Sequence, residues 1–357
     1  MLLRALLSTT WQGQRPLAIL DERGRSALEG LDAEIDIKWV KSSTFGRFGA
    51  ERLLARSARS NDRVFCFHNL PPIFPVAGDV VCFVHNAYIA GSVPLSGLKG
   101  WVRKRLKIER LIAGLFHYRV DTYVVQTQTI AAALAERNAQ SPKPIRVMPF
   151  VSLSASADLT KIAAAAASPH KADHMIAVQS VQSSRPNQRW NFVYLSDGSA
   201  HKNHRRLFEA WVILAEFGYF PSLAVTLHAK RDARLRSELT ELASRHSLKI
   251  EDLGQLPHSS ALLLYLQSDA LIFPSYAETF GIPLLEAKAA GLPILAPELD
   301  YVRDVCEPAA TFDPFSARSI ARAVRRFYGD TGDSMQPMSP QEFKEAMCDQ
   351  RSSHSGK

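Results

Sequence analysis

The first 150 residues alternate short apolar runs with stretches whose apolar positions recur at helical spacing. The runs predict strands at Leu17–Leu20, Ile35–Val40, Val64–Phe67, Val80–Val84, Thr122–Val125 and Ile145–Met148. The stretches between them predict helices around Arg47–Arg59, Leu98–Phe116 and Thr129–Arg137. Such alternation indicates a mostly parallel sheet that is covered by helices on both faces.

The pattern changes between residues 151 and 189, where Ser, Ala, Gln and Asn dominate and a run of alanines occurs. This composition is typical of an interdomain connection, and the alanines favour one helix within it. After Tyr328 the chain is polar again, with one helix predicted around Pro340–Met347.

From Trp190 the alternation of strands and helices resumes. It predicts strands at Asn191–Leu195, Leu223–Leu227, Leu248–Leu253, Ala270–Phe273 and Ile294–Ala296. It predicts helices over Asn203–Phe217, Arg231–His246, Ser260–Gln267, Pro283–Ala290 and Ser316–Phe327. We therefore predict an α/β protein with two doubly wound, Rossmann-like domains facing a cleft. They cover residues 1–150 and 190–330, with a linker over 151–189 and a polar tail over 331–357. Ligands of such sheets bind at the carboxyl ends of the strands.

Composition narrows the class of protein without naming its function. The 357 residues are 46% hydrophobic and 22% charged, which excludes a collagen, a disulfide miniprotein and a wholly disordered chain. No apolar run approaches the roughly 20 residues of a membrane span, and no signal peptide is predicted. The four cysteines form no CxxC pair, and no DxD occurs. We predict a cytoplasmic protein with reduced thiols, no metal site and no cofactor.

The net charge of +8 is concentrated in one segment. Between residues 99 and 119 lie seven Lys or Arg residues and one Glu, among apolar residues at helical spacing. This amphipathic basic helix favours an anionic membrane surface, with the candidate contacts Trp101, Arg103, Lys104, Arg105 and Lys107. A helix that packs on the core and exposes a solvated basic face explains the pattern equally well. Nucleic acid is disfavoured as a partner, because no known binding signature is present.

The segment from residue 270 to 297 carries the clearest chemistry. A predicted strand runs into a loop, Pro283 then begins a helix, and Gly291 ends it. Free amides of Gly281–Leu284 would form an anion site at this helix start. Glu278 and Glu286 stand eight residues apart, in the loop and in the expected first helical turn, so that both carboxylates could bind one polyhydroxylated ligand. A carboxylate in a first turn also stabilises the helix dipole without any ligand.

A second segment, Leu195–Leu207 (LSDGSAHKNHRRL), places a lysine before another predicted helix. The helix dipole disfavours a cation at that position, so Lys202 is best explained by an anion bound between the lysine and the helix. Ser199 and Asn203 could also act as simple N-caps.

Together these segments resemble the retaining GT-B glycosyltransferases of family 4, in the donor domain known as glycosyl transferases group 1. The resemblance covers about residues 190–328, and the family's E-x7-E motif falls on Glu278 and Glu286. It implies that Glu278 contacts the donor sugar, that Glu286 holds the nucleotide ribose, and that Lys202 and Asn203 lie at the diphosphate. It also implies that backbone amides of Phe280, Gly281 and Ile282 meet sugar or phosphate. The strand that ends in His85 resembles the family's strand with a catalytic-centre histidine.

Two departures from the family pattern stand out. Many relatives carry an arginine several residues before the lysine, where this chain has Ser196, Asp197 and Gly198. Family members also begin with a strand and a glycine-rich loop, whereas here Met1–Ser8 resembles the helix that follows them. Either the true start of the chain lies upstream of Met1, or the amino-terminal domain lacks its first strand, and such a loss would leave a gap in the sheet.

The leading hypothesis is a retaining glycosyltransferase that moves a hexosyl group from a nucleotide diphosphate sugar to a hydroxyl acceptor. The acceptor expected from the basic helix is a glycan or lipid-linked precursor of a surface polysaccharide such as lipopolysaccharide, at the inner face of the plasma membrane. An alternative is a catalytically silent GT-B homologue that binds glycans or assembly partners. A third reading is another sugar-nucleotide enzyme, such as an epimerase or phosphorylase.

Overall fold

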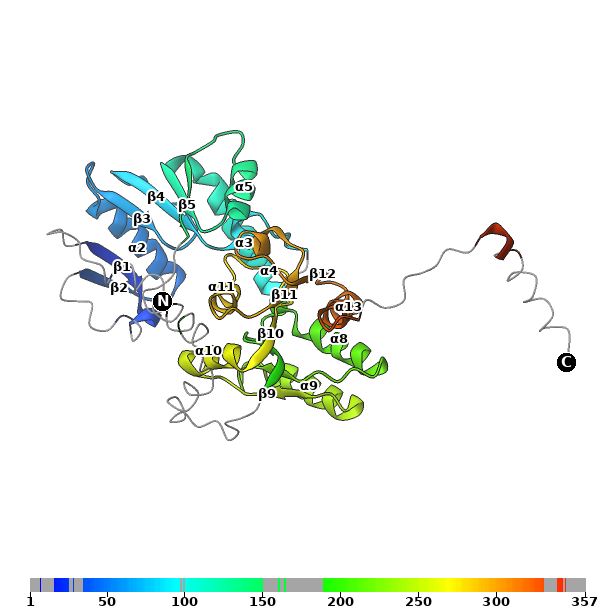
Figure 1. Cartoon of the computed structure of the whole chain (residues 1–357). Helices are drawn as coiled ribbons and strands as arrows, with labels where there is room; N and C mark the ends of the chain where they lie inside the picture. The colour runs from blue at the N-terminus through cyan, green and yellow to red at the C-terminus, as the bar shows by residue number, and fades with distance from the viewer. Residues whose placement is uncertain are drawn as a thin grey trace.

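The computed structural model describes residues 16–25, residues 35–149 apart from 97 and 99, and residues 189–330, with isolated positions outside these ranges. Figure 1 shows two bodies of strands and helices, one from each half of the chain. Most of the linker and of Met1–Ser8, where helices were expected, lies outside the described residues. Of the helix expected at Pro340–Met347, residues 340–342 and 344 are described, and they are helical. Every strand pairing is parallel, as the alternating pattern predicts.

The amino-terminal strands form two separate sheets. One pairs β1 (Leu17–Asp21) with β2 (Asp36–Val40); the other has the order β3 (Arg63–Cys66), β4 (Asp79–Val84), β5 (Thr122–Val125), β6 (Ile145–Val147). Among the described residues, no ladder joins the two sheets. In a doubly wound sheet the first strand lies between the second and the fourth, so its loss would separate the next two strands from the rest. The predicted gap stays a prediction, because residues 1–15 other than Leu7 lie outside the described residues.

Several helices of this half start at polar caps. They are α2 (Thr44–Ser57), α3 (Ala87–Ala90), α4 (Gly100–Leu115) and α5 (Gln128–Arg137), with the short 3-10 turns η1 (Glu22–Gly24) and η3 (His117–Arg119). Ser43 caps α2 and Thr127 caps α5, each through a side-chain oxygen that accepts a backbone N–H of the first turn. Strand β4 is buried along nearly its whole length, which is expected of a parallel strand covered on both faces.

The carboxyl-terminal half contains one six-stranded parallel sheet. Its strands are β7 (Trp190–Tyr194), β8 (Leu223–Val225), β9 (Ile250–Asp252), β10 (Ser268–Ile272), β11 (Ile294–Pro297) and β12 (Ala310–Phe312). The spatial order is β12-β11-β10-β7-β8-β9. The chain therefore builds outward from β7 in one direction and from β10 in the other. The loops after β7 and β10 separate at this switch point, which is where open α/β sheets bind their ligands.

Helices surround this sheet and complete its core (Figure 1). They are α8 (His204–Glu216), α9 (Ala233–His246), α10 (His258–Leu266), α11 (Ile282–Ala289), α12 (Asp300–Arg303) and α13 (Ala317–Phe327), with the 3-10 turn η4 (Ala200–Lys202) before α8. Leu207, Trp211 and Leu214 form the buried stripe of α8 that their helical spacing predicts. The two halves also touch, since the Thr129 N–H donates to the Asp304 carboxylate over 2.9 Å.

The predicted elements agree with the structure to within a few residues, with three omissions. Strand β12 and helices α3 and α12 were not predicted from the sequence, because elements of three or four residues are too short to show a hydrophobic period. Helix α11 begins at Ile282 rather than Pro283. Gly281 precedes it with a φ of 66°, a left-handed conformation that glycine adopts without strain.

His204, the first residue of α8, is an unusual member of the core. Its side chain is buried between the rings of Tyr194 and Phe208, at centroid distances of 4.8 and 6.0 Å. Neither ring nitrogen has a hydrogen-bond partner among the described residues. Burial lowers the pKa of His204 to about 4, so the imidazole is neutral near pH 7.

We predict that His204 makes stability depend on pH. Unfolded protein takes up a proton at this histidine near pH 6.5, whereas folded protein does so only near pH 4, so the free energy of unfolding falls as the pH drops through that window. From pH 7 to pH 5 the loss should be about 2 kcal/mol. Urea unfolding at both pH values should show a loss that is smaller by about this amount in His204→Phe than in the wild type. A loss remains in the variant because desolvation also lowers the pKa values of His68, His85 and His201, which contribute in both proteins. As a control, Phe208→Leu should lower stability equally at both pH values; equal pH slopes for wild type and His204→Phe would contradict the assignment.

Candidate active site

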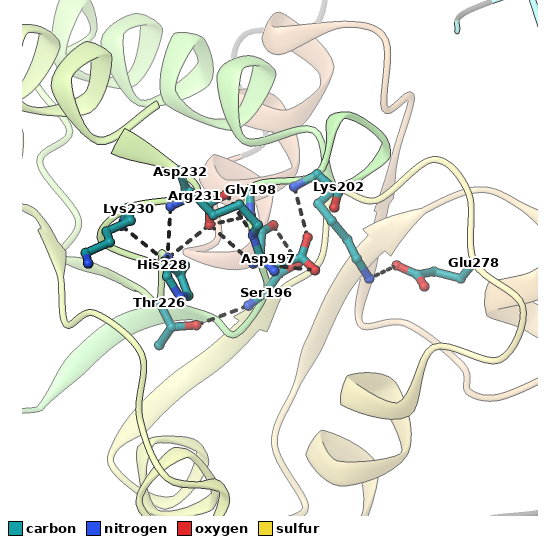
Figure 2. Close-up of polar contacts among 11 residues, drawn as sticks. Ser196, Asp197, Gly198, Lys202, Thr226, His228, Lys230, Arg231, Asp232 and Glu278 are labelled. Carbon is teal, nitrogen blue, oxygen red and sulfur yellow. Dashed lines mark hydrogen bonds and ion pairs between the residues drawn. The ribbon is translucent and has the colours of Figure 1, made fainter. Parts of the chain in front are cut away.

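The loops after β7 and β10 bring Lys202 and Glu278 together. The Lys202 Nζ lies 2.5 Å from the Glu278 Oε1, and the two side chains are only 16% and 13% exposed. Figure 2 shows them reaching toward each other from their separate loops. Two residues 76 positions apart thus form a shielded ion pair at the edge of the sheet where ligands bind.

The backbone around Lys202 is held from both sides. The Tyr194 hydroxyl donates to the Lys202 carbonyl over 2.7 Å. Asn203 has a left-handed backbone conformation, which asparagine tolerates better than most residues. Its side-chain nitrogen donates to the carbonyls of Pro274 and Pro314 at 3.1 and 2.6 Å. Asn203 therefore occupies the N-cap position of α8 without capping it, and it fastens the Lys202 turn to the loop after β10.

The loop that carries Glu278 is attached to the same turn. The His201 carbonyl accepts the Tyr276 N–H at 3.0 Å and lies 3.1 Å from the Ser275 hydroxyl. The Ser275 hydroxyl also lies 2.7 Å from the Glu278 Oε1. These contacts fix the carboxylate of Glu278 opposite the ammonium of Lys202. The His201 imidazole supplies no cation near pH 7, because burial, and then the charge of Lys202, lowers its pKa.

The turn at Gly281 offers fewer amides than the sequence predicted. The Leu284 N–H donates to the Gly281 carbonyl at 2.9 Å, and Pro283 has no N–H. The anion site expected from the free amides of Gly281–Leu284 is therefore wrong in extent, because the Leu284 amide is already used and those of Gly281 and Ile282 remain. Phe280 packs partly against the core, whereas Ile282 is exposed.

Glu286 differs from Glu278 in its surroundings. It stands in the second turn of α11 rather than the first, so helix-dipole compensation does not account for it. Its buried carboxylate accepts a hydrogen bond from the Tyr265 hydroxyl over 2.9 Å and lies 2.9 Å from His258 Nε2. Both contacts come from α10, which holds the carboxylate in a fixed orientation beneath the loop.

His85 is brought to this site from the amino-terminal half. Its N–H donates to the Asn69 side chain at 2.7 Å, and its carbonyl accepts the Thr279 hydroxyl at 2.6 Å. Thr279 directly follows Glu278, so the histidine lies beside the loop that the E-x7-E spacing singled out. Burial lowers the pKa of His85, which leaves its imidazole neutral near pH 7.

The structure adds residues that sequence reasoning missed. The ring of Tyr88 lies edge-on to His201, 6.4 Å between centroids. Burial, Tyr276 and the charge of Glu278 raise the pKa of Tyr88 to about 12.

The Asp232 carboxylate accepts the Gly198 N–H at 3.1 Å (Figure 2). A Cβ at Gly198 would lie 2.6 Å from the Asp232 carboxylate carbon, so only glycine fits there. Of the contacts that sequence reasoning missed, only the one with Asp232 had a signal in the sequence, namely the glycine at position 198.

The basic helix predicted from the sequence is α4, which carries none of the site residues described above. Helix α4 buries only Leu106 and Ala113, and it exposes Trp101, which is 70% accessible. Arg103, Lys104, Arg105 and Lys107 are exposed as well. No described helix is long and apolar enough to cross a membrane, and no described cluster of His, Cys, Asp or Glu is arranged around a metal position.

The family comparison matches the half of the chain that holds Lys202 and Glu278. Residues 176–345 match the glycosyl transferases group 1 family. Among curated proteins, the O-antigen chain mannosyltransferase B of Escherichia coli is 25% identical over 134 residues. That match covers 37% of this chain and 35% of the relative, so the chain spans about a third of the relative's length.

Solved structures match the fold over most of the chain. An α,α-trehalose-phosphate synthase from Burkholderia vietnamiensis has a TM-score of 0.59 at 11% identity, covering 88% of this chain and 91% of that one. A glycosyltransferase from Rickettsia africae has a TM-score of 0.58 at 16% identity, covering 90% of each chain. The Anabaena protein Alr3699/HepE in complex with UDP has a TM-score of 0.55 at 14% identity, covering 89% and 91%.

At these identities the structural matches show the fold alone. That fold is α/β with parallel sheets in two Rossmann-like halves. The chain therefore has the GT-B fold of its structural neighbours, and residues 176–345 of its carboxyl-terminal half are similar to the glycosyl transferases group 1 family.

Proposed function

We propose that this protein is a retaining family 4 glycosyltransferase that moves a hexosyl group from a nucleoside diphosphate sugar to a hydroxyl acceptor. The observation that supports it most directly is the Lys202–Glu278 pair at the switch point of a sheet in the matched domain. A cation and a carboxylate side by side match the two ends of the bond to be broken, a diphosphate and a sugar.

The chemistry follows from where charge develops. Cleavage of the anomeric C–O bond leaves positive character on the sugar and negative charge on the departing diphosphate. Lys202 and the amides of Gly281 and Ile282 would stabilise that diphosphate, since preorganised donors act where charge appears. Donor binding would replace the Glu278 carboxylate at the Lys202 ammonium and free it for the sugar hydroxyls.

The remaining residues complete the proposed donor site. Glu286, oriented by α10, would hold the ribose hydroxyls, and the neutral imidazole of His85 would face the transferred sugar from the other half. In the retaining route that we propose, the acceptor attacks from the leaving-group face. The departing phosphate then takes the acceptor's proton, so no glutamate is needed as a nucleophile.

We further propose a glycan or lipid-linked acceptor from surface polysaccharide assembly. The E. coli relative is named as an O-antigen mannosyltransferase, and the Anabaena neighbour was solved with UDP, which supports a nucleotide-sugar donor in such a pathway. The exposed apolar residues of α4 add support for a membrane surface, because they alternate with cations that complement anionic lipid headgroups. The reaction would then take place at the inner face of the plasma membrane.

One observation favours a second candidate function. Among the described residues, the β1–β2 sheet is separate from the β3–β6 sheet, so the half that would receive the acceptor has no continuous sheet. A protein that binds nucleotide sugars or glycans without turnover would tolerate such a break. Donor binding without transfer or hydrolysis would support this candidate over the enzyme.

We predict that Lys202→Ala and Glu278→Ala each reduce sugar transfer by about 100-fold or more, because each removes a group that acts at the reacting bond. The measurement is product formation from a panel of UDP- and GDP-sugars with lipid-linked and soluble acceptors. The controls are Lys249→Ala and Glu241→Ala, which change exposed residues of α9 and the start of β9. Circular dichroism checks folding, since each variant leaves a shielded charge unpaired. Wild-type transfer rates in both site variants would refute the site.

We predict that α4 binds anionic vesicles through both its cations and its apolar residues. Flotation with phosphatidylglycerol vesicles should recover the wild type, and vesicles of phosphatidylcholine alone should not. Each cation near the surface contributes about 1 kcal/mol, so replacing Arg103, Lys104 and Lys107 by Ser should weaken partitioning roughly 100-fold. Leu111→Ser with Leu115→Ser should weaken it too, because both leucines are exposed.

The matched control removes three cations elsewhere, by replacing Arg234, Arg245 and Lys249 with Ser. Equal flotation of the α4 triple variant and this control would show that general charge, rather than α4, attracts the vesicles. No flotation of the wild type would contradict the membrane surface and favour a soluble acceptor.

A further inference from the structure

A second cation, Arg231, lies at the same edge of the sheet as Lys202. It comes from the loop after β8, and its side chain is 57% exposed. Its Nη2 lies 3.8 Å from the Asp197 carboxylate, which belongs to the loop after β7. Figure 2 shows Asp197 between Arg231 and the turn that carries Lys202. Arg231 thus faces, from the loop after a neighbouring strand, a carboxylate on the loop that leads to Lys202.

A rigid turn sets the position of Arg231. His228 Nδ1 accepts the N–H groups of Lys230 and Arg231 at 3.2 and 3.1 Å. The Asp232 carboxylate accepts the N–H groups of His228 and Gly198 at 2.9 and 3.1 Å, and so it joins the loop after β8 to the loop after β7. Because Gly198 has no Cβ, these loops approach closely enough to keep Arg231 beside Asp197.

Both cations stand where a helix by itself would disfavour them. Lys202 precedes the N-cap residue of α8, and Arg231 precedes the N-cap residue of α9. The positive ends of both helix dipoles therefore add to the charge of the side chains. A negative group at this edge would be attracted by two side chains and two helix ends.

Asp197 occupies that position in the structure. Burial would raise the pKa of Asp197, but hydrogen bonds from Ser199 and the charges of Lys202 and Arg231 outweigh it and lower the pKa. The carboxylate is therefore ionised near pH 7. Glu278 pairs with Lys202 at 2.5 Å, whereas Arg231 donates to the Asp232 carboxylate at 3.3 and 3.4 Å and lies 3.8 Å from Asp197. Each cation therefore already faces a carboxylate oxygen, the kind of acceptor that a phosphate also offers.

We propose that Arg231, whose guanidinium is held by Asp232, is the second phosphate-binding cation of the donor site, and that a nucleoside diphosphate displaces the Asp197 carboxylate from beside it. This inference rests on the proposed function, because it assigns a further residue to the same donor. Two cations match the two phosphates of the donor. The planar guanidinium can bind phosphate oxygens through two parallel hydrogen bonds, which the lysine ammonium cannot do.

The test measures the dissociation constants of UDP and GDP by isothermal titration calorimetry. Arg231→Gln should weaken binding about tenfold or more, as expected for the loss of charge-assisted hydrogen bonds to phosphate. Arg231→Lys keeps the charge but loses the paired N–H donors of the guanidinium, so its dissociation constant should lie between those of the wild type and Arg231→Gln. The matched control is Arg234→Gln, which removes a 90%-exposed arginine from the first turn of α9 and should bind like the wild type.

Asp197→Asn separates phosphate binding from a structural role. If Arg231 only tethers these loops through Asp232 and Asp197, Arg231→Gln and Asp197→Asn should both weaken nucleotide binding. In our proposal Asp197 competes with phosphate, so Asp197→Asn should tighten binding several-fold, and less so in the Arg231→Gln background. Raising the salt concentration should weaken binding less in Arg231→Gln than in the wild type.

The outcomes separate this inference from the proposed function. Failure of the wild type to bind either UDP or GDP would overturn both. If the wild type binds UDP or GDP and Arg231→Gln binds with the same dissociation constant, the role of Arg231 is overturned and the donor site is not. Weaker binding in both Arg231→Gln and Asp197→Asn would show a structural pair and would also overturn it.

Discussion

The ion pair of Lys202 with Glu278 depends on the order of strands in the carboxyl-terminal sheet. Strands β7 and β10 are neighbours in space although 76 residues separate the pair, and their loops leave the sheet at the point where the order reverses. Little of either side chain reaches water, so removal of one partner would leave the other as a shielded, uncompensated charge. The hydrogen bonds through His201, Ser275 and Asn203 hold the two loops in the register that the pair requires.

The two glutamates of the motif meet different physical demands. Glu278 stands in a loop at the sheet edge, where its carboxylate faces a cation that a ligand could take over. Glu286 stands one element later, with its carboxylate held by a tyrosine hydroxyl and a histidine of α10. An eight-residue spacing spans this distance, since it runs from the loop to the second turn of the helix. One carboxylate is thus exchangeable and the other is preorganised.

The amino-terminal half contributes to the site through few residues. The carbonyl of His85 binds Thr279, and Tyr88 meets His201, so strand β4 and the helix after it supply that side. The two sheets of this half are separate, yet β4 lies within the larger one and is buried. The break therefore leaves the position of His85 intact. Its effect falls on β1 and β2, which carry none of the site residues named above.

Local pattern alone was enough to locate most strands and helices and to single out Lys202, Glu278 and Glu286, whereas His85 was identified only through the family resemblance. Hydrophobic periodicity reports which segments can be buried, and a motif within one loop and helix is visible along the chain. The assembly around these residues was decided by tertiary structure. Asn203 was expected at a ligand or as a cap and instead binds two carbonyls from later loops, while the pairing of Arg231 with Asp197 spans 34 residues. Such contacts depend on strand order and loop geometry, and these arise only when distant segments pack together, so no local pattern records them.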